Sequence, residues 1–91
     1  MHAMKFEGHE KAQAQVLYYD DNSMALRSYS TIVATVDSEG WLHVNGLYSP
    51  TTIKHLGWFA RMLNTSYHTM KTLLLDNKDM NLVTGEVRDW E

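Results

Sequence analysis

The clearest structural signal in this 91-residue sequence is the stretch from Tyr48 to Leu63, which reads YSPTTIKHLGWFARML. Ser49 can act as a helix N-cap, and Pro50 suits the first helical position, where no backbone N–H is needed. Apolar residues then recur at the spacing of one helix face, at Ile53, Leu56, Ala60 and Leu63. The stretch therefore predicts a helix with an apolar face. Gly57 inside it indicates a close approach to the sheet that the helix crosses.

A second helix is predicted after Asn64. Thr65 or Ser66 can cap its start, and the sequence Asp76-Asn77 marks its end. Between them, apolar residues recur at helical spacing, at Tyr67, Met70, Leu73 and Leu74. The two helices lie in a window, residues 41–75, that carries three basic residues and no acidic one. The helical part is therefore the basic part of a chain whose net charge is −3.

The chain before Tyr48 predicts β-structure. Residues 13–19, 24–36 and 41–45 are rich in β-branched and aromatic side chains, and short polar turns separate them. Strands joined by short turns pair antiparallel. We therefore predict an α+β fold: a three-stranded antiparallel sheet (meander) followed by two α-helices packed on one face. Period-two alternation assigns three side chains to the core face of that sheet: Ile32, Leu42 and Val44.

Length and composition set the remaining bounds. Ninety-one residues predict a single domain, 1–91, in which residues 1–10 and 78–91 are flexible or peripheral. The absence of cysteine excludes disulfides and thiolate metal sites. No apolar run approaches the roughly 20 residues of a membrane span. We therefore expect a cytoplasmic protein without a membrane partner.

Catalytic motifs are missing from the sequence. The five histidines do not have the spacing of metal ligands on a helix, and no glycine-rich phosphate loop or nucleophile elbow is present. The carboxylates lie in turns and termini, where nothing raises their pKa for acid–base chemistry. The sequence therefore predicts no catalytic residue, no metal site and no cofactor, and a protein that is not an enzyme.

Binding is the function that the composition favours. Tryptophan, tyrosine and methionine are enriched in the cores of protein interfaces, and this chain holds more of them than one small core requires. One flank of the first helix is also not needed by its apolar stripe. We therefore expect a partner-binding surface in the helical region, formed by Lys54, His55, Trp58, Arg61 and Tyr67.

Residues 59–73 resemble the core of the helix-turn-helix family, with Ala60, Ser66, Thr69 and Met70 at the matching positions. Asn64 stands where the family usually has a turn glycine. Few positive charges are available to neutralise phosphates, which weakens the likeness to a DNA binder. The resemblance implies an alternative function, a small DNA-binding protein. Its groove-facing residues would be Ser66, Tyr67, His68, Thr69 and Lys71.

Two blocks, RSYSTIVA at residues 27–34 and GLYSPTTIKHL at residues 46–56, resemble a group of small uncharacterised phage and prophage proteins. Their shared pattern is Ser-Tyr-x-Thr-x-Val-Ala followed by Tyr-Ser-x-Thr-Thr-x-Arg/Lys-His-Ile/Leu. The resemblance implies a mobile-element origin and a bacterial host cell. By analogy with small phage proteins, we expect a binding protein that inhibits a host defence protein, as anti-CRISPR proteins inhibit CRISPR nucleases. A homodimer is a further expectation.

Overall fold

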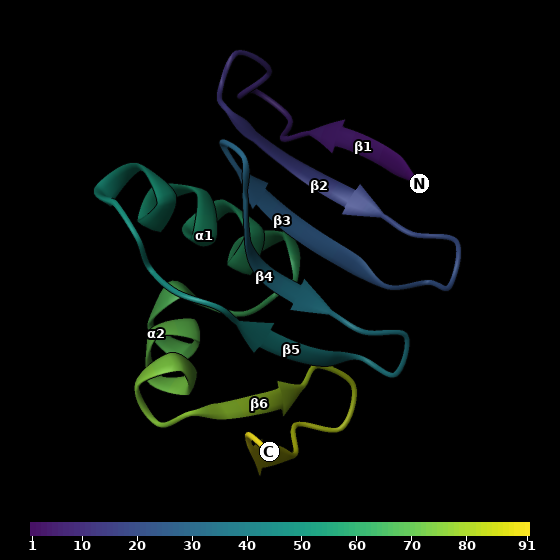
Figure 1. Ribbon diagram of the computed structural model, residues 1–91, viewed down its shortest axis with the longest axis vertical. Helices are drawn as coiled ribbons and strands as arrows, with labels where there is room; N and C mark the ends of the chain where they lie inside the picture. Colours follow the sequence, from purple (N-terminus) through teal and green to yellow (C-terminus); the bar gives the residue numbers. More distant parts are fainter.

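The computed structural model describes residues 1–91 as one seven-stranded antiparallel sheet and two helices (Figure 1). The strands are β1 (His2–Lys5), β2 (Ala14–Tyr18), β3 (Met24–Ser28), β4 (Thr31–Val36), β5 (Trp41–Val44), β6 (Lys78–Asn81) and β7 (Val87–Asp89). The helices are α1 (Pro50–Met62) and α2 (Tyr67–Leu75). Strand order in the sheet follows the chain, and both helices are inserted between β5 and β6.

The prediction of a three-stranded sheet is therefore wrong. Residues 24–36 form two strands, because the chain reverses at Tyr29, whose φ of 56° is unusual for a tyrosine. β1, β6 and β7 were missed because they are short, and β1 and β7 are exposed along their whole length. Such strands lack the apolar alternation that identifies a strand in a sequence.

Both helices begin where their caps predict. The Ser49 side chain accepts a hydrogen bond from the backbone N–H of Thr52, and Pro50 is the first residue of α1. Ser66 does the same for Thr69 at the start of α2. Neither helix has the length and apolarity that a membrane crossing requires.

The core lies between the helices and one face of the sheet. Fourteen buried residues form it, and the helices contribute Leu56, Phe59, Ala60, Met70 and Leu73. α1 is rotated relative to its predicted orientation: Leu56 and Ala60 are buried as expected, whereas Ile53 and Leu63 are only partly buried.

A β-bulge sets which side chains of β4 face the core. Leu42 and Val44 of β5 are fully buried, as predicted. On β4 the prediction fails, because the register with β3 shifts between Leu26 and Arg27. Val33 becomes the extra residue and is buried beside Ala34, while Ile32 is only partly buried.

Candidate functional site

The helical layer leaves one corner of the sheet uncovered. α1 packs chiefly on β3 and β4, and α2 packs on β5 and β6, so β1 and β2 project beyond the helices (Figure 1). A groove of about 450 Å³ lies there, between β1 and the flank of α1. We call it the β1–α1 groove. Its apolar lining is Met4, Phe6, Val16, Tyr18, Trp58 and Met62.

Trp58 is held rigidly in the wall of this groove. The His9 imidazole stacks on its indole at 3.8 Å between ring centroids, and Phe6 meets it edge-on at 5.7 Å. The Lys54 ammonium lies 5.6 Å from the ring centroid, within the range of a cation–π interaction. Contacts from the β1–β2 connection and from α1 itself thus hold the indole in place.

Apolar side chains stay exposed beside Trp58. Met4 is 50% exposed and Met62 is 43% exposed, and the Tyr18 hydroxyl lies 4.0 Å from the Met62 sulfur. Methionine adapts its shape readily to a ligand, because its side chain is unbranched and polarizable. Exposed apolar area rimmed by polar groups is typical of a surface that binds another molecule.

Charged groups lie on both faces of the sheet near β1. On the groove side, Arg61 and Glu7 line the β1–α1 groove, and Lys54 and Glu10 lie in the adjoining hollow beside Trp58. Lys5 shares a cross-strand row with Gln15 and Arg27 and so points to the opposite face, where its ammonium donates to the Ala12 carbonyl at 2.7 Å. The hollow that Lys5 and Arg27 line on that face has no acidic residue, so its electrostatic potential favours acidic groups.

The structure brings three of the five expected partner-binding residues together. Lys54, Trp58 and Arg61 lie along the groove side of α1. His55 is instead buried, with 1% of its surface exposed, and Tyr67 is partly buried and packs against the core. Of the five residues, His55 alone is buried, whereas Tyr67 keeps a partly exposed side chain, as Trp58 does.

His55 belongs to a buried polar network that joins α1 to β3. Its Nδ1 lies 2.7 Å from the Ser28 hydroxyl, which in turn lies 3.1 Å from the Thr52 hydroxyl. Burial lowers the pKa of His55, and the nearby Lys54 charge lowers it further. The network satisfies the hydrogen-bonding groups of three buried side chains, which accounts for a polar patch within the helix–sheet contact.

Residues of the DNA-binding alternative have structural contacts of their own. The Ser66 hydroxyl caps α2 and lies 3.0 Å from the Thr69 hydroxyl, and Tyr67 packs against the core. His68 and Lys71 are exposed. This alternative stays a prediction.

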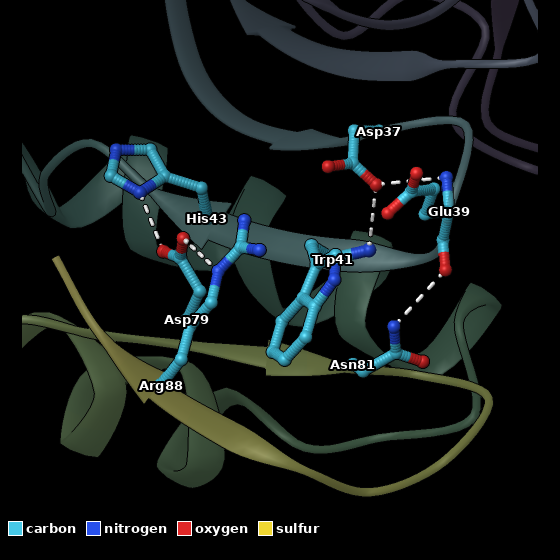
Figure 2. Close-up of polar contacts among 7 residues, drawn as sticks. All are labelled: Asp37, Glu39, Trp41, His43, Asp79, Asn81 and Arg88. Carbon is cyan, nitrogen blue, oxygen red and sulfur yellow. Dashed lines mark hydrogen bonds and ion pairs between the residues drawn. The ribbon is translucent and has the colours of Figure 1, made fainter. Parts of the chain in front are cut away.

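A second polar cluster, which the sequence did not reveal, lies at the opposite end of the sheet (Figure 2). The His43 Nδ1 lies 2.7 Å from one oxygen of Asp79, and the Arg88 Nε lies 3.5 Å from the other. The Arg88 guanidinium also lies 3.9 Å from the centroid of the Trp41 ring. The three strands β5, β6 and β7 are thereby joined through one carboxylate, which is 13% exposed.

The surroundings of this cluster are also structured. Trp90 packs on His43 at 4.8 Å between ring centroids, and its buried indole Nε1 has no hydrogen-bond partner. The Asn81 amide donates to the Glu39 carbonyl at 3.0 Å, and this bond joins the β4–β5 turn to β6 (Figure 2). No three His, Cys, Asp or Glu side chains are placed to hold a metal ion. These contacts fix the position of the last two strands.

Comparison with known proteins identifies the family. The model of a family of unknown function (DUF8033) matches residues 4–77. The chain belongs to this family. No curated protein and no solved structure matches it.

The range matched by the family model covers the β1–α1 groove fully but the His43 cluster only in part. It contains every residue that lines the β1–α1 groove, from Met4 to Met62. It ends before β6, so Asp79, Arg88 and Trp90 lie outside it. The groove is therefore built from the family domain, whereas the His43 cluster needs the terminal hairpin as well.

Only part of the groove could be found from the sequence. Trp58 and Arg61 were predicted from the helical pattern of α1. Phe6 and His9 were missed, because they come from a segment that was expected to be flexible or peripheral. Asp79 was missed for the same reason at the other terminus. A cue was present in Phe6, a large apolar residue in an otherwise polar segment.

Proposed function

We propose that this protein is a non-enzymatic binding protein that holds a segment of another protein in the β1–α1 groove. The observation that carries the proposal is a formed apolar groove with a fixed indole, Trp58, and two half-exposed methionines at its sides. Sites of this kind offer large apolar contact area around an anchor residue, which is where most binding energy concentrates.

Charge defines the chemistry of the partner. On the groove side, Lys54 and Arg61 lie near Glu7 and Glu10, whereas Lys5 and Arg27 on the opposite face line a hollow without an acidic residue. A partner segment that carries both apolar side chains and carboxylates would match the groove on one face and these two basic groups on the other. Complementary charge would also speed the encounter and make it sensitive to salt.

Within this proposal the partner is a host defence protein, such as a CRISPR nuclease. That identity is supported by the phage-like blocks at residues 27–34 and 46–56. The second block forms the start of α1 and the residues that precede it, so the resemblance lies next to the proposed binding surface.

The test is affinity capture with a double variant, Trp58→Ala with Arg61→Glu. Tagged wild-type protein and the variant are incubated with lysate of a bacterial host, and captured proteins are quantified by mass spectrometry. The amount of specific partner captured by the double variant should fall about tenfold or more, since removal of a central aromatic anchor costs about 2 kcal/mol of binding free energy.

Lys71→Glu provides the matched control, because Lys71 is an exposed basic residue of α2 outside the groove lining. It should capture the same partner as the wild type, and thermal melts should show all variants folded. Equal capture by the double variant, or loss in the Lys71→Glu variant as well, would contradict the groove as the binding surface.

A further inference from the structure

β1 forms a free edge of the sheet, and the hydrogen-bond pattern shows which of its groups are unpaired. At the β2–β3 turn, the Tyr19 N–H donates to the Ser23 carbonyl at 2.9 Å. Antiparallel pairs alternate between bonded and non-bonded residues. Leu17 therefore bonds to Ala25 of β3, and its two neighbours on β2 turn their main-chain groups toward β1.

Those neighbours, Val16 and Tyr18, stand opposite Met4 and His2. Met4 and His2 consequently use their main-chain groups on β2. Ala3 and Lys5 lie between and beyond them, so their N–H and C=O groups point away from the sheet. β1 thus presents outward donors and acceptors at alternate residues, the arrangement that a further strand requires.

The outer edge of β1 has little of the protection that such edges usually carry. It has no proline and no bulge, and its one charged side chain, Lys5, is tied back to the Ala12 carbonyl. At the other end, β7 has three residues, of which Arg88 and Asp89 are charged and paired with β6. The β7 edge is thus short and charged, whereas the β1 edge is longer and carries a single charged side chain.

The β1 edge borders the β1–α1 groove. Met4 shares a cross-strand row with Val16 and Leu26, which face the core side of the sheet, and Met4 itself lines the groove. A strand added beside β1 would point alternate side chains to that same side. Those side chains would lie over the groove, next to Met4 and Phe6.

We propose that the partner segment binds as an extended strand added to the outer edge of β1. Its main chain pairs with the free groups of Ala3 and Lys5. Its alternate apolar side chains lie over the β1–α1 groove, and the acidic side chains between them point to the opposite face of the sheet, toward Lys5 and Arg27. Strand addition of this kind gives affinity through the main chain and selectivity through the pockets. The inference rests on the proposed function, since it assigns the geometry of the same site.

Charge argues against a second copy of this chain as the occupant. Antiparallel pairing of β1 with its own copy would place two Lys5 side chains, and no acidic strand residue, on one face of the joined sheet. Like charges across a strand pair are unfavourable. An acidic segment from another protein meets no such repulsion.

The test uses substitutions at Ala3, whose side chain is exposed. Ala3→Pro removes the outward N–H and places a ring on the free edge, without taking a hydrogen bond from β2. Ala3→Val keeps the N–H and is the matched control. The probe is a phage-displayed library of random 12-residue peptides, selected in parallel on the wild type and on the Ala3→Pro, Ala3→Val and Trp58→Ala variants.

Peptides should be enriched on the wild type and on Ala3→Val, with apolar and acidic residues alternating at period two. Their affinity for Ala3→Pro should fall about tenfold or more, because main-chain bonds are lost and the edge is blocked. Superimposable thermal melts of Ala3→Pro and Ala3→Val show that the fold persists.

Each of the other outcomes would contradict a defined part of the proposal. Peptides that bind Ala3→Pro as well as Ala3→Val, yet do not bind Trp58→Ala, would contradict strand addition but support the groove as the binding site. Apolar residues at helical spacing, with no effect of Ala3→Pro, would assign a helical occupant instead. Undiminished binding to Trp58→Ala would show that the groove is not the binding site. The absence of any enriched peptide would contradict strand addition. Dimerisation that Ala3→Pro abolishes, measured by light scattering, would make a second copy the occupant.

Discussion

The two ends of the sheet differ in how many side-chain contacts hold their last strand. At the β7 end, one carboxylate joins His43 and Arg88, and Lys78 pairs with Asp89 across the outermost strands. At the β1 end, the four strand residues are exposed, and apolar side chains are left partly uncovered beside Trp58. Polar contacts within the chain hold the last strand at one end, whereas the other end leaves apolar surface uncovered. On the proposed function, the first end serves stability and the second serves binding.

The largest expected effect is at the β7 end. Asp79→Ala removes the carboxylate that serves two strands and leaves His43 and Arg88 without their partner. We expect a loss of about 2 kcal/mol in the free energy of unfolding, measured by urea denaturation, because two groups lose their charged acceptor. Affinity for peptides selected on the β1–α1 groove should not change.

Met4→Ser makes the reciprocal comparison at the β1 end. Met4 is half exposed, so its replacement should change the free energy of unfolding by less than about 0.5 kcal/mol. It should nevertheless weaken binding of groove-selected peptides. The division between the two ends fails if Met4→Ser destabilises the protein as much as Asp79→Ala does.

A smaller effect concerns pH and the contact between α1 and β3. Burial lowers the pKa of His55 in the folded protein, so the unfolded chain binds a proton more readily below its ordinary pKa of about 6.5. Stability from this residue is therefore present above that pH and is lost as the pH falls through and below it. His55→Gln should show a flatter dependence between pH 7.5 and pH 5.5 in urea denaturation. If the free energy of unfolding depended on pH equally in the wild type and in His55→Gln, the conclusion that His55 is neutral in the folded protein would be wrong.

The last comparison concerns Gly57 on α1. An added Cβ at Gly57 would meet no atom within 4 Å, so the close approach to the sheet predicted from the sequence does not exist. Gly57→Ala should raise the free energy of unfolding by up to about 1 kcal/mol through helix propensity. Gly40→Ala is the contrasting control: with φ at +93° and a Val83 methyl 3.1 Å from the new Cβ, it should destabilise.

Sequence reasoning succeeded where structure is local. The caps Ser49 and Ser66 and the apolar periods behind them specified both helices, because capping and periodicity depend on residues a few positions apart. The reversal at Tyr29 was missed because a positive φ there is sustained by pairing between β3 and β4, not by a glycine.

The site was only partly predictable because its walls come from distant segments. Trp58 was identified on α1, but the stacking of His9 on it depends on how the β1–β2 connection folds back. His55 was assigned to an exposed flank because its burial depends on Ser28, which lies 27 residues away along the chain. A helical pattern predicts the direction in which a side chain points, but it does not predict which residue that side chain contacts.

The positions of the three tryptophans give each end of the sheet its own chromophore. Trp58 lies in the groove, whereas Trp41 and Trp90 pack around Arg88 and His43. In a Trp41→Phe, Trp90→Phe background, the remaining indole emission would report on the groove alone. In a Trp58→Phe background it would report on the terminal hairpin. Occupancy at one end and unfolding at the other can thus be followed separately in one molecule.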